Sequence, residues 1–293
     1  MKKFRFYIFY YLLLSFFLLQ CSSVKTNSEN KHFIWKINSG KATVYLLGSI
    51  HLAKESLYPL EPLIESSFAE SDNLVVELNI DKINPSELMK KVLYQDGNTL
   101  EANVSPEIYA KLKSMFDKNG IPRLVYEKAH PWFATVMLVN FELKANGYDE
   151  KNGIDQHFLN KADEKRILEL ESADEQLSLF NEFDKYSEEF VEYSLSDLKN
   201  TTEQVDELYE AWKTGNTKLF EQLIDVTTED NPKLEVIFNK LIKERNIKMA
   251  DKIAGYLESN EKYFVVVGAG HIVGKTGILN LLKEKNKYKI EQL

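Results

Sequence analysis

Residues 43–51 read TVYLLGSIH, and residues 263–271 read YFVVVGAGH. Each stretch is a run of β-branched, aromatic and aliphatic residues that leads into Gly-x-x-His. Such a run, ended by glycine, is typical of a buried strand that breaks into a turn. His51 and His271 would then follow the carboxyl ends of two strands, where open α/β sheets place their ligand sites. Because the chain has only five histidines, the two matched positions indicate a shared role.

Other strand-like runs lie before, between and after these two stretches. The sequence predicts strands at residues 33–37, 43–47, 74–78, 166–170, 263–267 and 288–292. Helices are expected at residues 59–69, 131–145, 154–162 and 277–285, and others begin at Asn84 and Ser105, each of which precedes a proline. Residues 173–260 have helical periodicity, broken near Gly215 and at Asn231-Pro232, with little strand character.

The strands therefore lie at both ends and in the middle of the chain. The two Gly-x-x-His turns can meet only if both ends join one sheet, and two independent domains would separate the histidines. The sequence predicts an α/β fold, with α+β as the alternative: a mixed central sheet flanked by helices, with a largely helical insertion before the last strands. Residues 32–293 are expected to form this one domain.

The N-terminus has the layout of an export signal. Lys2, Lys3 and Arg5 precede an apolar run over residues 6–19, which is shorter than the roughly 20 residues of a membrane-spanning helix. Residues 18–21, LLQC, resemble a bacterial lipobox, although Gln20 stands where a small residue is usual. We expect residues 1–20 to be a signal peptide and residues 21–31 to be a lipidated Cys21 and a polar tether. An uncleaved signal anchor and an ordinary secreted protein are the alternatives.

Charge and cysteine content exclude several classes of protein. The formal net charge is −8, and removal of residues 1–20, with three basic and no acidic residues, would leave about −11. So acidic a chain is not expected to bind nucleic acid. Cys21 is the only cysteine, so the exported domain would have no disulfide, no thiolate nucleophile and no cysteine-ligated zinc.

Four predicted strand ends carry a polar residue that suits metal chemistry: His51, Glu77, Glu171 and His271. If the strands are parallel and adjacent, these side chains crowd one edge of the sheet. Two imidazoles with two carboxylates suit a catalytic divalent cation such as zinc, manganese, cobalt or iron. The helical motif His-Glu-x-x-His is absent, so the site would be assembled from distant segments.

Two other interpretations compete with a metal site. A histidine after a strand and a glycine is often a structural turn residue, and structural roles are expected for His32, His130 and His157. Residues 268–274, GAGHIVG, also resemble a dinucleotide-binding glycine loop. We disfavour that interpretation because the chain ends two residues after Glu291, where a ribose-binding carboxylate would stand, and leaves no room for the remaining βαβ unit.

Taken together, these motifs resemble the TraB/PrgY/GumN family, whose animal relatives are the membrane-anchored Tiki metalloproteases. The resemblance runs from about Phe33 to the C-terminus. It is carried, in order, by residues 47–51 (LGSIH), 75–77 (VVE), 131–132 (PW), 147–148 (GY), 153–155 (GID), 170–171 (LE) with 176–177 (QL), 244–246 (ERN) and 267–274 (VGAGHIVG).

The resemblance implies a metal-dependent, hydrolase-like site in which His51, His271 and Glu77 hold the metal. Manganese or cobalt is the expected metal rather than zinc. The resemblance also implies catalytic roles for Glu77 and Glu171, and Asp155 matches a position that recurs in the family. Arg245 is implied to contact substrate or a carboxylate. The expected function is a peptidase-like lipoprotein of the bacterial cell envelope, anchored through Cys21 in the outer membrane, with a peptide or protein substrate. The alternative is a non-catalytic surface lipoprotein that binds a peptide signal. The oligomeric state is left open.

Overall fold

The computed structural model describes residues 31–196, 201–224 and 232–293. The predicted signal peptide, Cys21, the tether through residue 30 and the predicted break at Asn231 lie outside the described residues. In the part of the chain that is described, no helix combines the length and the apolar character needed to cross a membrane.

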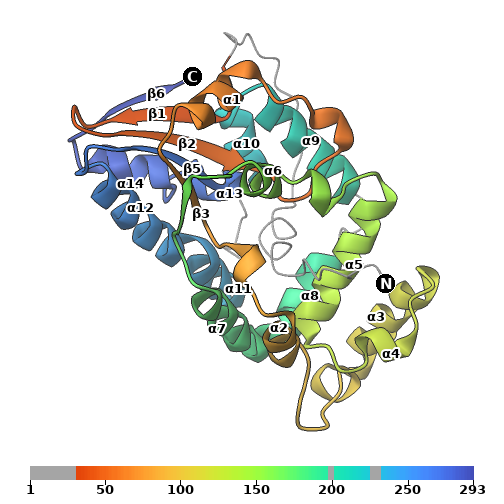
Figure 1. The fold of residues 1–293 in the computed structure, drawn as a ribbon. Coiled ribbons are helices and arrows are strands. Elements are labelled where there is room, and N and C mark those ends of the chain that lie inside the picture. Colours follow the sequence, from red (N-terminus) through yellow and green to blue (C-terminus); the bar gives the residue numbers. More distant parts are fainter. Residues whose placement is uncertain (1–30, 197–200, 225–231) are drawn as a thin grey trace.

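Six strands form one mixed sheet in the order β4-β3-β5-β2-β1-β6 (Figure 1). Their bounds are β1 Ile34–Asn38, β2 Thr43–Ser49, β3 Asn73–Val76, β4 Arg166–Glu169, β5 Lys262–Gly268 and β6 Lys289–Gln292. The four strands β4, β3, β5 and β2 run parallel, whereas β1 is antiparallel to both β2 and β6. The carboxyl ends of four neighbouring strands therefore share one edge of the sheet.

The helices fill the connections between the strands. Before β4 they are α1 Pro62–Ala69, α2 Pro85–Val92, α3 Pro106–Lys118, α4 Arg123–Tyr126, α5 Pro131–Ala145 and α6 Ile154–Asn160. Between β4 and β5 lie α7 Ala173–Phe183, α8 Ser187–Ser196, α9 Thr201–Lys213, α10 Thr217–Ile224, α11 Pro232–Phe238, a π-helical segment Asn239–Glu244 and α12 Arg245–Tyr256. After β5 come α13 Ala269–Ile272 and α14 Ile278–Glu284.

Helices cover both faces of the sheet. Phe264 of β5 packs against Phe68 of α1 and Phe158 of α6, with ring centroids 5.4 and 4.7 Å apart. Its neighbour Tyr263, whose side chain points to the opposite face because side chains alternate along a strand, stacks on Tyr256 of α12 at 4.7 Å. The central strands are therefore buried on both sides, which explains why they read as continuous apolar runs.

The predicted α/β class, mixed sheet and helical insertion are confirmed. The local order of strand, helix and strand over β2, α1 and β3 is also present, but β5 lies between β2 and β3 and pairs with both. The histidine of the second Gly-x-x-His stands in the short helix α13 rather than in an open turn. The helix predicted at residues 131–145, whose apolar residues lie almost all around it, matches α5, in which most of these side chains are buried and Phe141 is exposed.

Candidate metal and hydrolytic centre

His51, Glu77 and His271 surround Gly268 at the carboxyl edge of the sheet. A methyl group added at Gly268 would lie 3.1 Å from Glu77 Oε1, 3.3 Å from His51 Nε2 and 3.6 Å from His271 Cδ2. The Gly268 N–H donates to Glu77 Oε1 at 2.5 Å. All three side chains are buried. They therefore enclose one small volume that stays open because residue 268 has no side chain.

His51 is oriented by Asp155 from the start of α6. Its Nδ1 lies 2.6 Å from Asp155 Oδ2, and because a carboxylate accepts, Nδ1 carries the proton. The neutral ring then has its lone pair on Nε2, toward Gly268. Gly153 allows this contact: a side chain there would collide with the carbonyl oxygen of His51, and the Ile154 N–H donates to the carbonyl of Ile50 at 3.0 Å. The first turn of α6 thus packs directly on the Gly-x-x-His turn.

His271 is oriented by an amide instead of a carboxylate. Its Nδ1 lies 2.6 Å from Asn246 Oδ1. The amide orientation is fixed because Asn246 Nδ2 donates to the carbonyl of Thr276 at 2.8 Å. Asn246 Oδ1 therefore accepts, and Nδ1 of His271 carries the proton. The Nε2 atom of His271 is buried and has no hydrogen-bond partner among the described residues, so a lone pair in the site is left unsatisfied.

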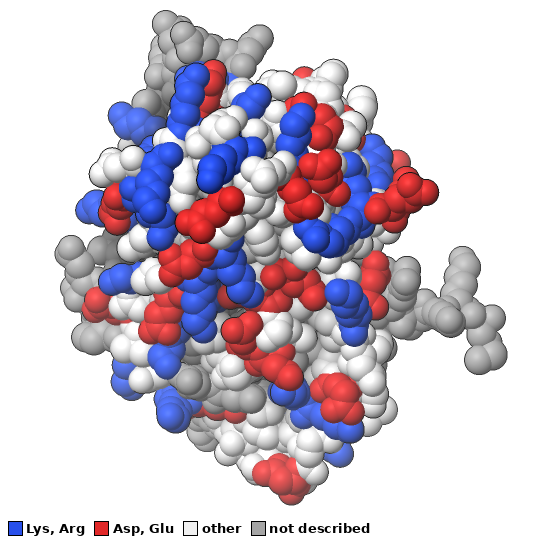
Figure 2. Space-filling model, turned by 60° about the vertical axis from the view of Figure 1, so that its left-hand side comes forward, with Lys and Arg blue, Asp and Glu red and all other residues white. Residues whose placement is uncertain are grey.

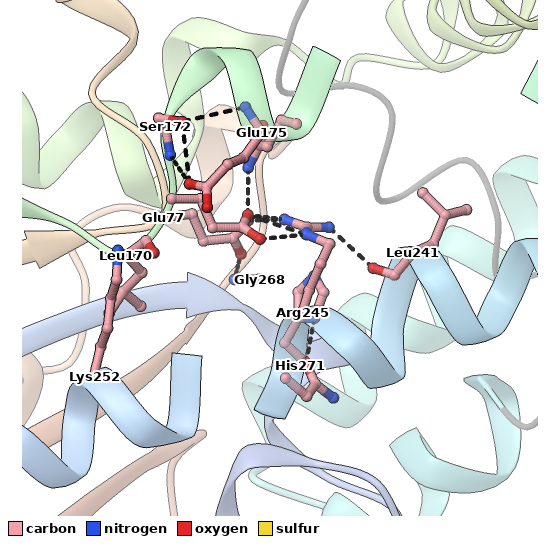
Figure 3. A network of polar contacts seen from close by, with 12 residues as sticks. Glu77, Leu170, Ser172, Glu175, Leu241, Arg245, Lys252, Gly268 and His271 are labelled. Carbon is pink, nitrogen blue, oxygen red and sulfur yellow. Dashed lines mark hydrogen bonds and ion pairs between the residues drawn. The ribbon is translucent and has the colours of Figure 1, made fainter. Parts of the chain in front are cut away.

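Arg245 links the two glutamates that follow β3 and β4 (Figure 3). Its Nε donates to Glu171 Oε1 at 2.8 Å and its Nη2 to Glu171 Oε2 at 2.5 Å. Nη2 also donates to Glu77 Oε2 at 3.1 Å, and Nη1 donates to the carbonyl of Leu241 at 3.1 Å. Gln176 donates to Glu171 Oε2 at 2.8 Å. Both oxygens of Glu171 are therefore engaged in holding the guanidinium group.

The surroundings push the ionisation of the two histidines in opposite directions. Burial lowers the pKa of His51, but the Asp155 carboxylate outweighs burial and raises the pKa above its ordinary value. Burial, together with the positive charge of Arg245 and with His51, holds the pKa of His271 well below its ordinary value. Burial also raises the pKa of Glu77, against the opposing effects of Arg245 and His51. His271 is thus a neutral ring, as a metal ligand must be.

The sequence patterns did not single out Arg245 and Asn246, although the family resemblance did. Both are buried at the start of α12, directly after the π-helical segment, and such segments often lie at functional sites. One feature of the sequence could have identified Asn246. Asn246 stands on the buried stripe that continues through Met249, Ala250 and Ile253, so a polar residue occupies an apolar position of the helix.

Trp212 is a third residue that the sequence patterns missed. Its indole Nε1 donates to the carbonyl of Gly48 at 2.6 Å. The bond ties α9, in the helical insertion, to the strand end that precedes His51. By contrast, His130 and His157 contact Asp184 and Glu65 at 2.7 and 2.8 Å and lie apart from the site, as structural histidines would.

A pocket opens at the same place. Its lining combines the two histidine turns with apolar side chains of the helical insertion and comprises Ser49, Ile50, His51, Val205, Leu208, Tyr209, Phe220, Ile224, Ile242 and residues 268–271. The polar side chains of Ser49, His51 and His271 thus come from the two histidine turns, and the insertion contributes apolar side chains and Tyr209.

The donor set can be tested against a divalent cation. Two imidazoles and a glutamate are ligand types that such cations take, and each imidazole is held through Nδ1 by a second residue, as in known metal sites. The site contains three carboxyl groups, of Glu77, Glu171 and Asp155, and one guanidinium group, of Arg245, a composition that suits a bound cation. Yet the described residues contain no cluster of three or more His, Cys, Asp or Glu spaced to hold a metal ion. The donors fit in type, while their spacing is not that of a completed ligand set.

The fold and the site together define an α/β protein with paired histidines, a glutamate and an arginine at the carboxyl edge of its sheet. Residues 33–292 match the TraB/PrgY/gumN family over most of the chain. The chain therefore belongs to the TraB/PrgY/gumN family, as the sequence motifs predicted.

Individual relatives are distant. The chain is 21% identical over 261 residues to the uncharacterized protein YbaP of Escherichia coli, covering 87% of this chain and 95% of YbaP. It is 22% identical over 320 residues to a metalloprotease TIKI homolog of the sponge Amphimedon queenslandica, covering 91% of this chain and 62% of that protein. A metalloprotease TIKI homolog of Nematostella vectensis is also 22% identical, over 95% of this chain and 70% of its own length. No solved structure matches.

Proposed function

We propose that this chain is a metal-dependent hydrolase that cleaves peptide bonds at the carboxyl edge of its sheet. The observation that carries the proposal is the pair of buried histidines whose Nδ1 atoms are each held by a second residue and whose rings lie, with Glu77, around Gly268. The names of the TIKI homologs support the same chemistry.

His51, His271 and Glu77 would hold the metal, with manganese or cobalt preferred over zinc. A bound divalent cation would polarise the substrate carbonyl and lower the pKa of a water molecule. Asp155 and Asn246 keep the imidazoles in the tautomer that offers Nε2.

Glu77 and Arg245 would do the remaining chemistry. Glu77, whose pKa is raised by burial, takes the proton of the attacking water as the oxygen adds to the carbonyl carbon. When the C–N bond breaks, that proton goes to the leaving amine, so that one water is consumed for each bond cut. Arg245 stabilises the ionised form of Glu77 before the proton is taken, and it stabilises the negative charge that develops on the carbonyl oxygen. Because Glu171 holds the guanidinium group at two points, through Oε1 and Oε2, we assign Glu171 the task of positioning Arg245.

Residues 1–21 would direct the protein to the cell envelope. We propose cleavage before Cys21 and lipidation of Cys21, with the domain held at the outer membrane. Metabolic labelling with a radioactive fatty acid tests this: the wild-type chain should be labelled and a Cys21→Ser variant should not. Labelling of both, or of neither, would overturn the lipoprotein assignment.

One observation favours a second candidate function, a non-catalytic peptide-binding lipoprotein. The side chains of the site are buried, and the described residues include no cluster already spaced for a metal. Such a protein would need the pocket and the polar network but no cation.

Metal content and cleavage, measured together, separate the two functions. The full-length chain is loaded in turn with Mn²⁺, Co²⁺ and Zn²⁺, and bound metal and hydrolysis of a peptide mixture are measured. His271→Ala should lose both. Asn246→Leu, which keeps the ligand but removes its support, should weaken metal affinity by about 10–100-fold.

The matched control is His130→Ala, because His130 also contacts a carboxylate through Nδ1 but lies outside the site. This variant should retain the metal and the activity. A wild-type chain that takes up none of the three metals would refute the hydrolase proposal. Equal activity of wild type and His271→Ala would refute the site.

A further inference from the structure

The pocket at the histidines has a chemically divided lining. Ser49, His51 and His271 form one end, and Val205 and Leu208 of α9 lie in the wall formed by the insertion. Phe220 and Ile224 of α10 and Ile242 of the π-helical segment complete that wall. With Tyr209 of α9, six residues from three segments form this wall. Their side chains are apolar, apart from the hydroxyl group of Tyr209.

The polar end of this pocket has unsatisfied groups. His271 Nε2 and Ser49 Oγ are buried and have no hydrogen-bond partner within the described part of the chain. A buried polar atom without a partner costs stability. Because His271 Nε2 is the proposed metal ligand, Ser49 Oγ is the atom that a polar group entering the pocket would satisfy. The apolar wall offers no hydrogen bond to such a group. What binds must therefore be polar at the histidine end and apolar at the helical end.

A peptide bond with a neighbouring hydrophobic side chain has this division. Building on the proposed hydrolase function, we infer that the pocket is a specificity site for a bulky uncharged side chain, aliphatic or aromatic, next to the bond that is cut. The carbonyl group of that residue lies at the polar end, within reach of the Ser49 hydroxyl, and its side chain lies against Val205, Leu208 and Phe220. An acidic or basic side chain is rejected, because the apolar wall provides no partner for a buried charge.

The burial of the site limits the form of the substrate. The Nε2 atoms of both histidines have almost no exposed surface, and the pocket is flanked by α9 and α10. A folded protein surface could not bring a peptide bond to these atoms, whereas a flexible segment or a short peptide could. The substrate class is therefore an unstructured peptide with a hydrophobic residue at the cut site.

A peptide series tests the inference. Capped octapeptides of one sequence, differing only in a central residue that is Leu, Phe, Ser or Asp, are given to the full-length Mn²⁺-loaded chain, and the cut site is read by mass spectrometry. Cleavage next to Leu or Phe should be at least about tenfold faster than next to Ser or Asp, as expected for burial of one large apolar side chain. Equal rates across the series would overturn the inference.

Two pocket variants and one control localise the preference. Val205→Phe, which fills the pocket, should lower the ratio of the Leu-peptide rate to the Ser-peptide rate at least about tenfold. Ile224→Ala, which enlarges the pocket, should shift the preference from Leu toward Phe. The control is Val125→Phe, at an exposed position of α4, which should behave as wild type. An unchanged preference in both pocket variants would refute the assignment of these walls.

Binding measurements keep the two proposals separable. Fluorescence anisotropy gives the affinity of labelled Leu and Ser peptides for the same proteins whether or not they are cut. If nothing is cleaved, the hydrolase proposal fails. In that case, tighter binding of the Leu peptide that disappears in Val205→Phe would still support the pocket, and equal binding of both peptides would overturn it.

Discussion

Replacement of Arg245 by methionine tests whether the buried arginine holds the site together. The guanidinium group donates hydrogen bonds to the two oxygens of Glu171, to one oxygen of Glu77 and to the carbonyl of Leu241. The side chain is only 5% exposed. Methionine keeps most of the apolar stem but leaves two buried carboxylates facing each other. Removal of one partner of a buried ion pair costs about 3–5 kcal/mol, because the other charge stays buried without a partner. Arg245→Met should therefore lower the free energy of unfolding by that amount.

The matched control is Arg123→Met. Arg123 bonds Glu101 at 3.0 Å, but its side chain is 54% exposed, so its loss should cost about 0–1 kcal/mol. Urea unfolding followed by tryptophan fluorescence and circular dichroism gives both values. The double variant Arg245→Met/Glu171→Met should recover part of the loss, since it removes one stranded carboxylate. A loss at Arg245 no larger than at Arg123, or no recovery in the double variant, would refute the reasoning.

Three further predictions concern the site and its supports. Gly268→Ala, whose methyl group would crowd the site atoms, should reduce bound metal and hydrolysis at least about tenfold, whereas Gly255→Ala, with open space around the added methyl group, should leave both within twofold. Equal effects would contradict the role of Gly268. Burial raises the pKa of Glu65, but hydrogen bonds from a lysine and a histidine outweigh it and lower the pKa. A lowered folded-state pKa stabilises the protein above the unfolded value of 4.5. Glu65→Gln should therefore cost about 0.5–1 kcal/mol at pH 7. In urea titrations the difference should shrink once the pH falls below 4.5 and vanish below the lowered folded-state pKa. Trp212→Phe, which leaves the carbonyl of Gly48 without its indole donor, should cost about 1–2 kcal/mol, and an unchanged urea midpoint would show that the bond is dispensable.

The strands could be predicted because each is a short apolar run with a turn signal at its end. The matching runs at residues 43–51 and 263–271 also predicted that the two ends of the chain meet in one sheet. What the pattern did not show is that β5 lies between β2 and β3. Local sequence specifies a strand and its buried faces. The order of strands is decided by packing between segments far apart in the chain, here Phe264 of β5 against Phe68 of α1 and Phe158 of α6.

The candidate site, like the fold, could be predicted only in part. His51, Glu77, Glu171 and His271 were predicted from local patterns, because each follows a strand. Arg245 arrives from a helix that looks charged and solvent-exposed, and its burial follows only from its contacts with two glutamates that lie far away in the sequence. The metal and catalytic roles of these residues stay predictions, which the measurements above address.

The two Gly-x-x-His turns are alike in sequence but not in chemistry, because their histidines have different supports. Asp155 holds His51 through one carboxylate oxygen, and a carboxylate makes the ring more basic. An aspartate could not replace Asn246, since Asn246 must also donate to the carbonyl of Thr276. His271 is therefore held by a neutral amide and, with Arg245 nearby, stays uncharged. The repeated motif thus yields one histidine whose ring is made more basic by a carboxylate and one whose ring is kept neutral beside an amide, so the two proposed metal ligands differ in donor strength.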